Sequence, residues 1–420
     1  MAANHVAAAD IENLSQDRPR ASETGRGNVI AEAKSVKLGE EDGAYEMERP
    51  EQRTTLPQAD DTFGGTDPRF RYIRNRPVLR AGPPDSLVSP NLAGRSAAAL
   101  AIAFQLFKSS DAAFANKCLL AAQHLFAHAN TAPSGNLTTY VPFSFYPETE
   151  WLSDLELGAV ELYFAVASGP GTAGWPAGLT TTDPLFYLRA AAHWASAYMS
   201  SSDDAIDTLN LYDVSGIAHY DLHKAIAQAS APAGLETSQA ALVADLKKAL
   251  DGALAKAHAD AFEFGFPWSV WDTASHGTGL AVMASEYDEL TGTSAYAEWS
   301  GRWLGNILGA NAWGSSFIVG DGTTFPHCIH HQVANITGAL DGTVPILRGA
   351  VVEGPNGTLY QGFVTGMRNC PPDDSDPFAP FNSNQAKFKD DIESFSTVEP
   401  AVDLSATSPL AFARQAAGRF

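Results

Sequence analysis

Apolar residues in this chain recur at the spacing of an α-helix, and this periodicity constrains the fold more than any other feature. Leu100, Ala103, Phe104 and Phe107 stand at i, i+3, i+4 and i+7, which places them on one helical face. Similar patterns begin near residues 111, 155, 183, 214, 238, 277, 296 and 408. Alternation with a period of two residues, which predicts strands, is scarce. We therefore expect an all-α chain of about nine helices.

Long loops rich in Gly, Pro and Trp separate the predicted helices. Helical hairpins joined by long loops at one end are typical of a toroid of paired helices. The structural alternative is a solenoid of helical repeats, but the sequence shows no strict short period of that kind. A helix start is clearest at Asp183, where Asp can cap the helix and Pro184 suits its first position. Asp154 is likewise predicted to cap the start of a helix.

The first 55 residues differ from the rest of the chain. Residues 1–55 are polar and charged and lack apolar periodicity, which predicts disorder, and the character changes at Leu56. The opening stretch lacks the basic end and apolar run of a signal peptide. No apolar run approaches the roughly 18 residues of a membrane-spanning helix. We therefore place the folded domain at residues 56–420 and assign no cellular location.

The charge balance narrows the classes of partner. Of the 420 residues, 27 are Lys or Arg and 48 are Asp or Glu, which gives a formal net charge of -21. Such a chain is not expected to bind nucleic acid, whose phosphates need basic side chains, or an anionic membrane surface. A neutral polysaccharide requires neither sign of charge and stays acceptable as a partner. Cys118, Cys328 and Cys370 allow one disulfide, and their spacing does not choose the pair.

The stretch of residues 388–406 holds two carboxylates at a fixed spacing, Asp390 and then Glu399. The residues around Glu399 are apolar, namely Val398, Pro400, Ala401 and Val402. A carboxyl group in apolar surroundings is costly to ionise, so its pKa should rise. An acid that is still protonated near neutral pH is what a glycosidase needs to protonate a leaving sugar oxygen.

The spacing of this stretch resembles the C-terminal signature of glycoside hydrolase family 9, the inverting cellulases. The places of the signature hold Phe388, Asp390, Phe395, Glu399, Ala401, Ser405 and Ala406. The one departure is Ser405, where the family has Asn. The resemblance implies that Glu399 is the general acid and that Asp390 is a second active-site carboxylate. The competing interpretation is a solvated loop with ordinary surface acids, which the full spacing disfavours.

A second motif, in residues 307–336, agrees with the first. It resembles the family's Gly-rich run that ends in His, any residue and Arg, with His330 in register and Gln332 in place of Arg. The resemblance implies that His330 contacts sugar next to the cleaved bond. Gln332 keeps a hydrogen-bond donor without the charge of Arg, as in an actinobacterial-type branch of the family.

His327, His330 and His331 also suggest a zinc site. They lack the i, i+4 spacing and a Cys or acidic partner, so no metal or other cofactor is expected.

Three tryptophans in loops are candidates for stacking on sugar rings. Trp268 and Trp271 lie in one loop ahead of a predicted helix, and Trp313 lies in the Gly-rich motif. Sugar rings present apolar C–H faces that flat indole rings can cover. Core packing explains such residues equally well, and the sequence does not decide between the two interpretations.

The resemblance extends from Leu56 to the C-terminus and implies an (α/α)6 barrel that hydrolyses β-1,4-glucosidic bonds in cellulose-type glucans. The predicted helices are fewer than the twelve of the barrel, which implies an incomplete barrel without its first helices.

The family's catalytic base lies in an early Asp-Ala-Gly-Asp motif, which does not occur in this sequence. The alternative is therefore a non-catalytic remnant or fragment that binds glucan. Cellulose, mixed-linkage glucan and xyloglucan all stay open as the glucan, as do endo and processive action.

Overall fold

Eleven α-helices and two short 3-10 helices form the regular structure of the described residues, which contain isolated β-bridges and no strand. The computed structural model describes residues 86–135, 137, 148–205, 208–266, 271–337, 347–362 and 367–419. Within these ranges the prediction of an all-α chain is confirmed. No described helix combines the length and the apolar character needed to cross a membrane. The segment 1–55, the boundary at Leu56 and Trp268 lie outside the described residues.

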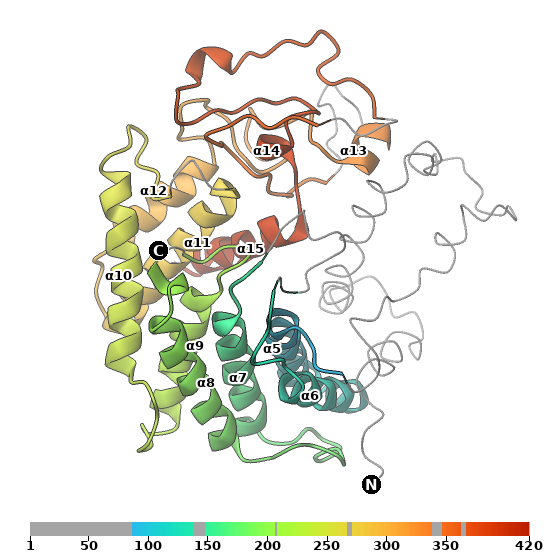
Figure 1. Ribbon diagram of the computed structural model, residues 1–420, viewed down its shortest axis with the longest axis vertical. Coiled ribbons are helices and arrows are strands. Elements are labelled where there is room, and N and C mark those ends of the chain that lie inside the picture. Colours follow the sequence, from blue (N-terminus) through green and yellow to red (C-terminus); the bar gives the residue numbers. More distant parts are fainter. Residues whose placement is uncertain are drawn as a thin grey trace, which may run out of the picture. The chain divides into compact units, whose positions relative to one another are not determined.

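The first of two compact units comprises described residues 86–205 and 212–246. Its helices are α5 (Pro90–Phe107), α6 (Ala112–Ala127), α7 (Leu152–Ala167), α8 (Pro184–Met199) and α9 (Ser215–Gln228), with the 3-10 helix η2 (Asp203–Ala205) after α8. Helix α7 packs against α5, α8 and α9 (Figure 1). A Cβ added to Gly94 on α5 would lie 2.2 Å from the carbonyl oxygen of Asp154. The close approach of α5 and α7 therefore requires glycine at this position.

One predicted helix start is confirmed and another is wrong. The Asp183 carboxylate accepts a hydrogen bond from the Leu185 N–H at 3.0 Å and so caps α8. Trp151, rather than Asp154, precedes the first residue of α7. The Asp154 carboxylate is buried within the first turn and pairs with Arg95 at 2.6 Å. The carboxylate thus binds α5 through Oδ1 and makes no capping hydrogen bond to the start of α7.

The second unit comprises described residues 208–211 and 247–419. Its long helices are α11 (Thr273–Thr291), α12 (Ala297–Ile307) and α15 (Val402–Ala416), while α13 (Gln332–Thr337), η3 (Ala379–Phe381) and α14 (Phe395–Val398) are short turns within the loops. Helix α10 (Gln239–Ala257) begins among residues of the first unit and ends among those of the second. Helix α11 packs against α12 and α15. Antiparallel bridges from Ile318 to Val351 and from Val352 to Pro400 tie the loops together.

A buried histidine between two carboxylates links three helices of the first unit. His219 on α9 has its Nδ1 2.8 Å from Glu156 on α7 and its Nε2 3.4 Å from Asp245 on α10. Burial works against the charged ring, but Glu156 and Asp245 outweigh it and raise the pKa of His219 to about 10. The imidazolium is therefore charged at neutral pH, whereas a free histidine titrates near about 6.5.

Replacing His219 with Ala should lower the free energy of unfolding by about 3–5 kcal/mol near neutral pH, because the buried Glu156 and the half-buried Asp245 lose their cation. Since the folded pKa lies above the free value, the stabilisation is complete below about pH 6.5. It is lost as the pH rises through about 10. Urea denaturation at a series of pH values measures both effects.

His193→Ala is the matched control for this experiment. His193 lies 3.0 Å from Glu236, but both side chains are largely exposed to solvent. Its loss should change the free energy of unfolding by less than about 1 kcal/mol. Equal losses in the two variants would contradict the stabilising role of the buried cation.

Candidate active site

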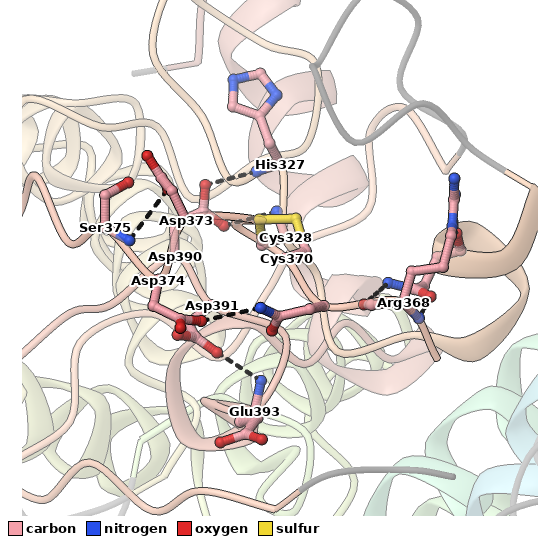
Figure 2. The surroundings of a disulfide bond; sticks show 12 residues. His327, Cys328, Arg368, Cys370, Asp373, Asp374, Ser375, Asp390, Asp391 and Glu393 are labelled. Carbon is pink, nitrogen blue, oxygen red and sulfur yellow. Dashed lines mark hydrogen bonds between the residues drawn. A yellow bond between two sulfur atoms is a disulfide. The ribbon is translucent and has the colours of Figure 1, made fainter. Parts of the chain in front are cut away.

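The two sequence motifs meet at the carboxylate of Asp390. Its two oxygens accept hydrogen bonds from the backbone N–H groups of His327 and Cys328, each at 2.8 Å (Figure 2). Burial raises the pKa of Asp390, and the two backbone N–H groups oppose that rise. Because each oxygen holds a backbone N–H group, this carboxylate clamps the histidine loop to the C-terminal motif.

The C-terminal motif also holds His330 at two points. The backbone N–H of His330 donates to the Val398 carbonyl at 3.0 Å, and its ring Nδ1 lies 2.5 Å from the Ile392 carbonyl oxygen. A carbonyl only accepts, so Nδ1 carries the proton in this contact and Nε2 of the neutral ring is an acceptor. Burial lowers the pKa of His330, which favours that neutral ring.

A disulfide joins Cys328 to Cys370 over a separation of 42 residues, and it settles the pairing that the sequence left open. Figure 2 shows the bridge next to Asp390. The Cys370 carbonyl accepts a hydrogen bond from the Ile392 N–H at 2.9 Å, so Cys370 is also tied to the C-terminal motif. Cys118 is buried on α6 and takes no part in the bridge.

Glu399 directly follows α14 and is half-buried. Its carbonyl accepts a hydrogen bond from the Glu353 N–H at 3.0 Å. Ser405, which stands where the family has Asn, accepts from the Val351 N–H at 3.0 Å and donates to the Ala401 carbonyl at 2.9 Å. The serine hydroxyl therefore joins the chain beyond Glu399 to the loop that contains Val351.

Three aromatic rings in nearly parallel planes adjoin the segment that carries Glu399. Trp271 lies 5.1 Å from Tyr360 at an angle of 25°, and 6.0 Å from Phe395 at 10°. The exposed fraction is 37% for Trp271 and 46% for Tyr360, so both rings can be reached by a ligand. An exposed aromatic surface of this kind suits the C–H face of a sugar. We did not expect Tyr360 here, because only the folded chain brings it to Trp271.

Trp313 has a different environment. It is buried, and its ring packs against Phe317 and Phe388. Its indole N–H donates to the Asn382 side-chain oxygen at 2.7 Å. This position matches the core-packing alternative for Trp313. Trp268 lies outside the described residues.

Gln332 is the first residue of α13, and its side chain is buried. Its amide nitrogen has no hydrogen-bond partner among the described residues. A buried donor without a partner costs about 1–3 kcal/mol. A ligand with an acceptor oxygen would remove this cost, so Gln332 can serve as a donor to a bound molecule.

Two further acids, Glu353 and Asp272, belong to this part of the chain: the Glu353 backbone binds that of Glu399, and Asp272 binds the Glu353 side chain. Glu353 is buried, and its Oε2 accepts a hydrogen bond from the Asp272 N–H at 2.5 Å. Burial, followed by the charges of Asp272 and Glu399, raises the pKa of Glu353 well above its usual value. Asp272 in turn lies 3.0 Å from the Nδ1 of His276. The signal in the sequence is an acid placed directly after two valines in an apolar run.

Comparison with known proteins identifies the family of this chain. The model of the family described as Glycosyl hydrolase family 9 matches residues 31–412, and the chain belongs to this family. "Endoglucanase 24" of Oryza sativa subsp. japonica is 25% identical over 308 residues, which cover 63% of this chain and 54% of the relative. The chain thus spans about half the length of this curated relative.

Solved structures of cellulases and endoglucanases share the fold. The cellulase Cel9M of C. cellulolyticum matches with a TM-score of 0.54 and 21% identity, over 79% of this chain and 65% of that one. An endoglucanase from the termite Nasutitermes takasagoensis matches with 0.55 and 21%, over 79% and 66%. An endoglucanase from Alicyclobacillus acidocaldarius matches with 0.56 and 17%, over 77% and 55%. The predicted fold class, the family's (α/α)6 barrel, is confirmed, and the matches cover no more than about two thirds of these three structures.

Loss of the disulfide should lower the free energy of unfolding by about 3–4 kcal/mol, because it closes a long loop. Urea denaturation with and without dithiothreitol measures this change in the wild type and in Cys370→Ser. We expect reduction to destabilise the wild type and to leave Cys370→Ser unchanged. Cys118→Ala is the control and should keep the response to reductant. A wild type that is indifferent to reductant would contradict the bridge.

Proposed function

We propose that this chain hydrolyses β-1,4-glucosidic bonds in cellulose-type glucans, with Glu399 as its general acid. The observation that carries the proposal is that His330 is bound by the carbonyls of Ile392 and of Val398, the residue directly before Glu399. The printed names of the relatives, endoglucanase and cellulase, support the same reaction. The partner would be a β-glucan polysaccharide, which a chain of net charge -21 can approach without charge repulsion.

Each residue has a separate role in this proposal. Trp271 and Tyr360 offer exposed rings on which a glucose ring can stack through its C–H faces. The Nε2 of His330 accepts a hydrogen bond from a sugar hydroxyl, and the buried amide of Gln332 donates one. Asp390 holds the histidine loop and so acts as a positioning residue for His330. Together these groups orient a sugar chain without any charged contact.

Glu399 would give its proton to the glycosidic oxygen as the bond to the sugar carbon breaks. In an inverting glycosidase a second carboxylate removes a proton from the attacking water. Asp390 is poorly placed for that role, because its oxygens bind backbone N–H groups. The Asp-Ala-Gly-Asp motif that carries the base in the family does not occur in the sequence. This observation favours a second candidate function, which is binding of glucan without cleavage.

Replacing Glu399 with Gln should reduce the hydrolysis of carboxymethylcellulose by about 100- to 10,000-fold, because an amide cannot supply the acid's proton. Release of reducing sugar measures the rate. Calorimetric titration with a cello-oligosaccharide measures whether binding survives, and we expect the affinity to change little.

Glu393→Gln is the matched control for Glu399→Gln. Glu393 is a half-buried glutamate of the same segment, and its N–H donates to Asp391. It should retain the wild-type rate. Equal rates in wild type and Glu399→Gln would remove Glu399 as the acid. Binding of glucan without hydrolysis in the wild type would favour the second candidate function.

Replacing Trp271 with Ala should weaken cello-oligosaccharide binding about tenfold, because the sugar loses its main stacking partner. Trp271→Tyr should restore part of the affinity. Trp299→Ala is the control, since the Trp299 ring on α12 packs against His258 and Trp303 instead. If calorimetry gives the same affinity for wild type and Trp271→Ala, the sugar does not stack on this ring.

A further inference from the structure

Glu353 lies directly across from Glu399 in a short antiparallel pairing. Val352 and Pro400 form the bridge, and the Glu353 N–H donates to the Glu399 carbonyl at 3.0 Å. In this register residue 353 faces residue 399. Directly opposite residues of an antiparallel pair project from the same face, with Cβ atoms about 5 Å apart. The two side chains therefore start from neighbouring positions, and the charge of Glu399 acts on Glu353.

The surrounding chain fixes Glu353 in this position. The side chain is 3% exposed, and its Oε2 accepts the Asp272 N–H at 2.5 Å. Asp272 adopts a left-handed backbone conformation with a φ of 57°, which turns its N–H into the site at the start of α11. Gly354, which follows Glu353, has a φ of 86°, and a Cβ there would lie 3.3 Å from the Ala274 nitrogen. The backbone conformations of Asp272 and Gly354 therefore hold the Glu353 carboxyl in one position.

Three other carboxyl groups act on Glu353. Asp272 lies at the start of α11, Glu399 follows α14, Asp403 lies in the first turn of α15, and all three charges act on Glu353. His276 on α11 lies beside Asp272. Like charges directly opposite each other destabilise a strand pair, and two carboxylates that share a site resist losing both protons. The buried Glu353 and the half-buried Glu399 should therefore keep one proton between them.

We propose that Glu353 and Glu399 share a proton and act together as the acid of this site. The last proton leaves the pair only when two neighbouring carboxylates become charged, so the pair stays an acid at higher pH than a lone glutamate. During cleavage this proton moves from Glu399 to the glycosidic oxygen, and solvent restores it to the pair. The role of the pair in cleavage rests on the proposed function of Glu399.

The first arm of the test is the pH dependence of carboxymethylcellulose hydrolysis. Glu353→Gln is nearly the same shape, and its amide oxygen can still accept the Asp272 N–H. We expect the basic limb of the activity profile to move to lower pH by about one unit or more. Glu298→Gln, an exposed side chain on α12, is the control and should leave the limb in place.

The second arm measures stability and does not depend on activity. The unfolded chain loses a glutamate proton above about pH 4.3, whereas the folded pair keeps one. Wild-type stability from this source therefore falls as the pH rises, and Glu353→Gln and Glu399→Gln should each remove that fall. Thermal unfolding from about pH 5 to about pH 8 measures it. The double variant should show no further change in pH dependence, because the proton is shared.

The outcomes are distinguishable. A basic limb that stays in place in an active Glu353→Gln enzyme would overturn the proposal. So would stability differences between the variants and wild type that do not change with pH. A wild-type chain that cleaves no glucan would contradict the proposed function alone, and the stability arm would then decide whether the two carboxyls share a proton.

Discussion

The site depends on one buried carboxylate, that of Asp390, and on the two backbone N–H groups that it accepts. His327 and Cys328 would each leave a donor unsatisfied without it, at a cost of about 1–3 kcal/mol per group. The same clamp sets the register in which His330 reaches the Val398 and Ile392 carbonyls. The two hydrogen bonds of Asp390 thus fix the loop that carries His330, and the disulfide at Cys328 reinforces the same loop.

Local pattern was enough to predict the helices and the two motifs, because both depend on short spacings along the chain. The cap at Asp183 follows from such a spacing. The Asp154 carboxylate instead binds Arg95, which is 59 positions away in the sequence. Tyr360 and Glu353 could not be predicted, since their importance comes only from what the fold places opposite them. The pairing of Cys328 with Cys370 was open for the same reason.

Burial favours different protonation states in the two units, and the uncharged states at the proposed site suit a neutral ligand. In the first unit burial is combined with a full ion pair, and His219 is held charged between two carboxylates. At the proposed site burial instead lowers the pKa of His330 and raises those of Asp390 and Glu353. Each of these directions favours the uncharged form. Hydroxyl groups and C–H faces, rather than ions, are what such a surface can recognise.

A crystal structure of the Glu399→Gln variant with a bound cello-oligosaccharide would test the assignment of the site most directly. We predict a sugar ring stacked on Trp271 or Tyr360, a sugar hydroxyl on the Nε2 of His330, and the residue 399 amide within hydrogen-bonding distance of a glycosidic oxygen. An oligosaccharide bound away from residue 399, with His330 and Trp271 untouched, would contradict the assignment.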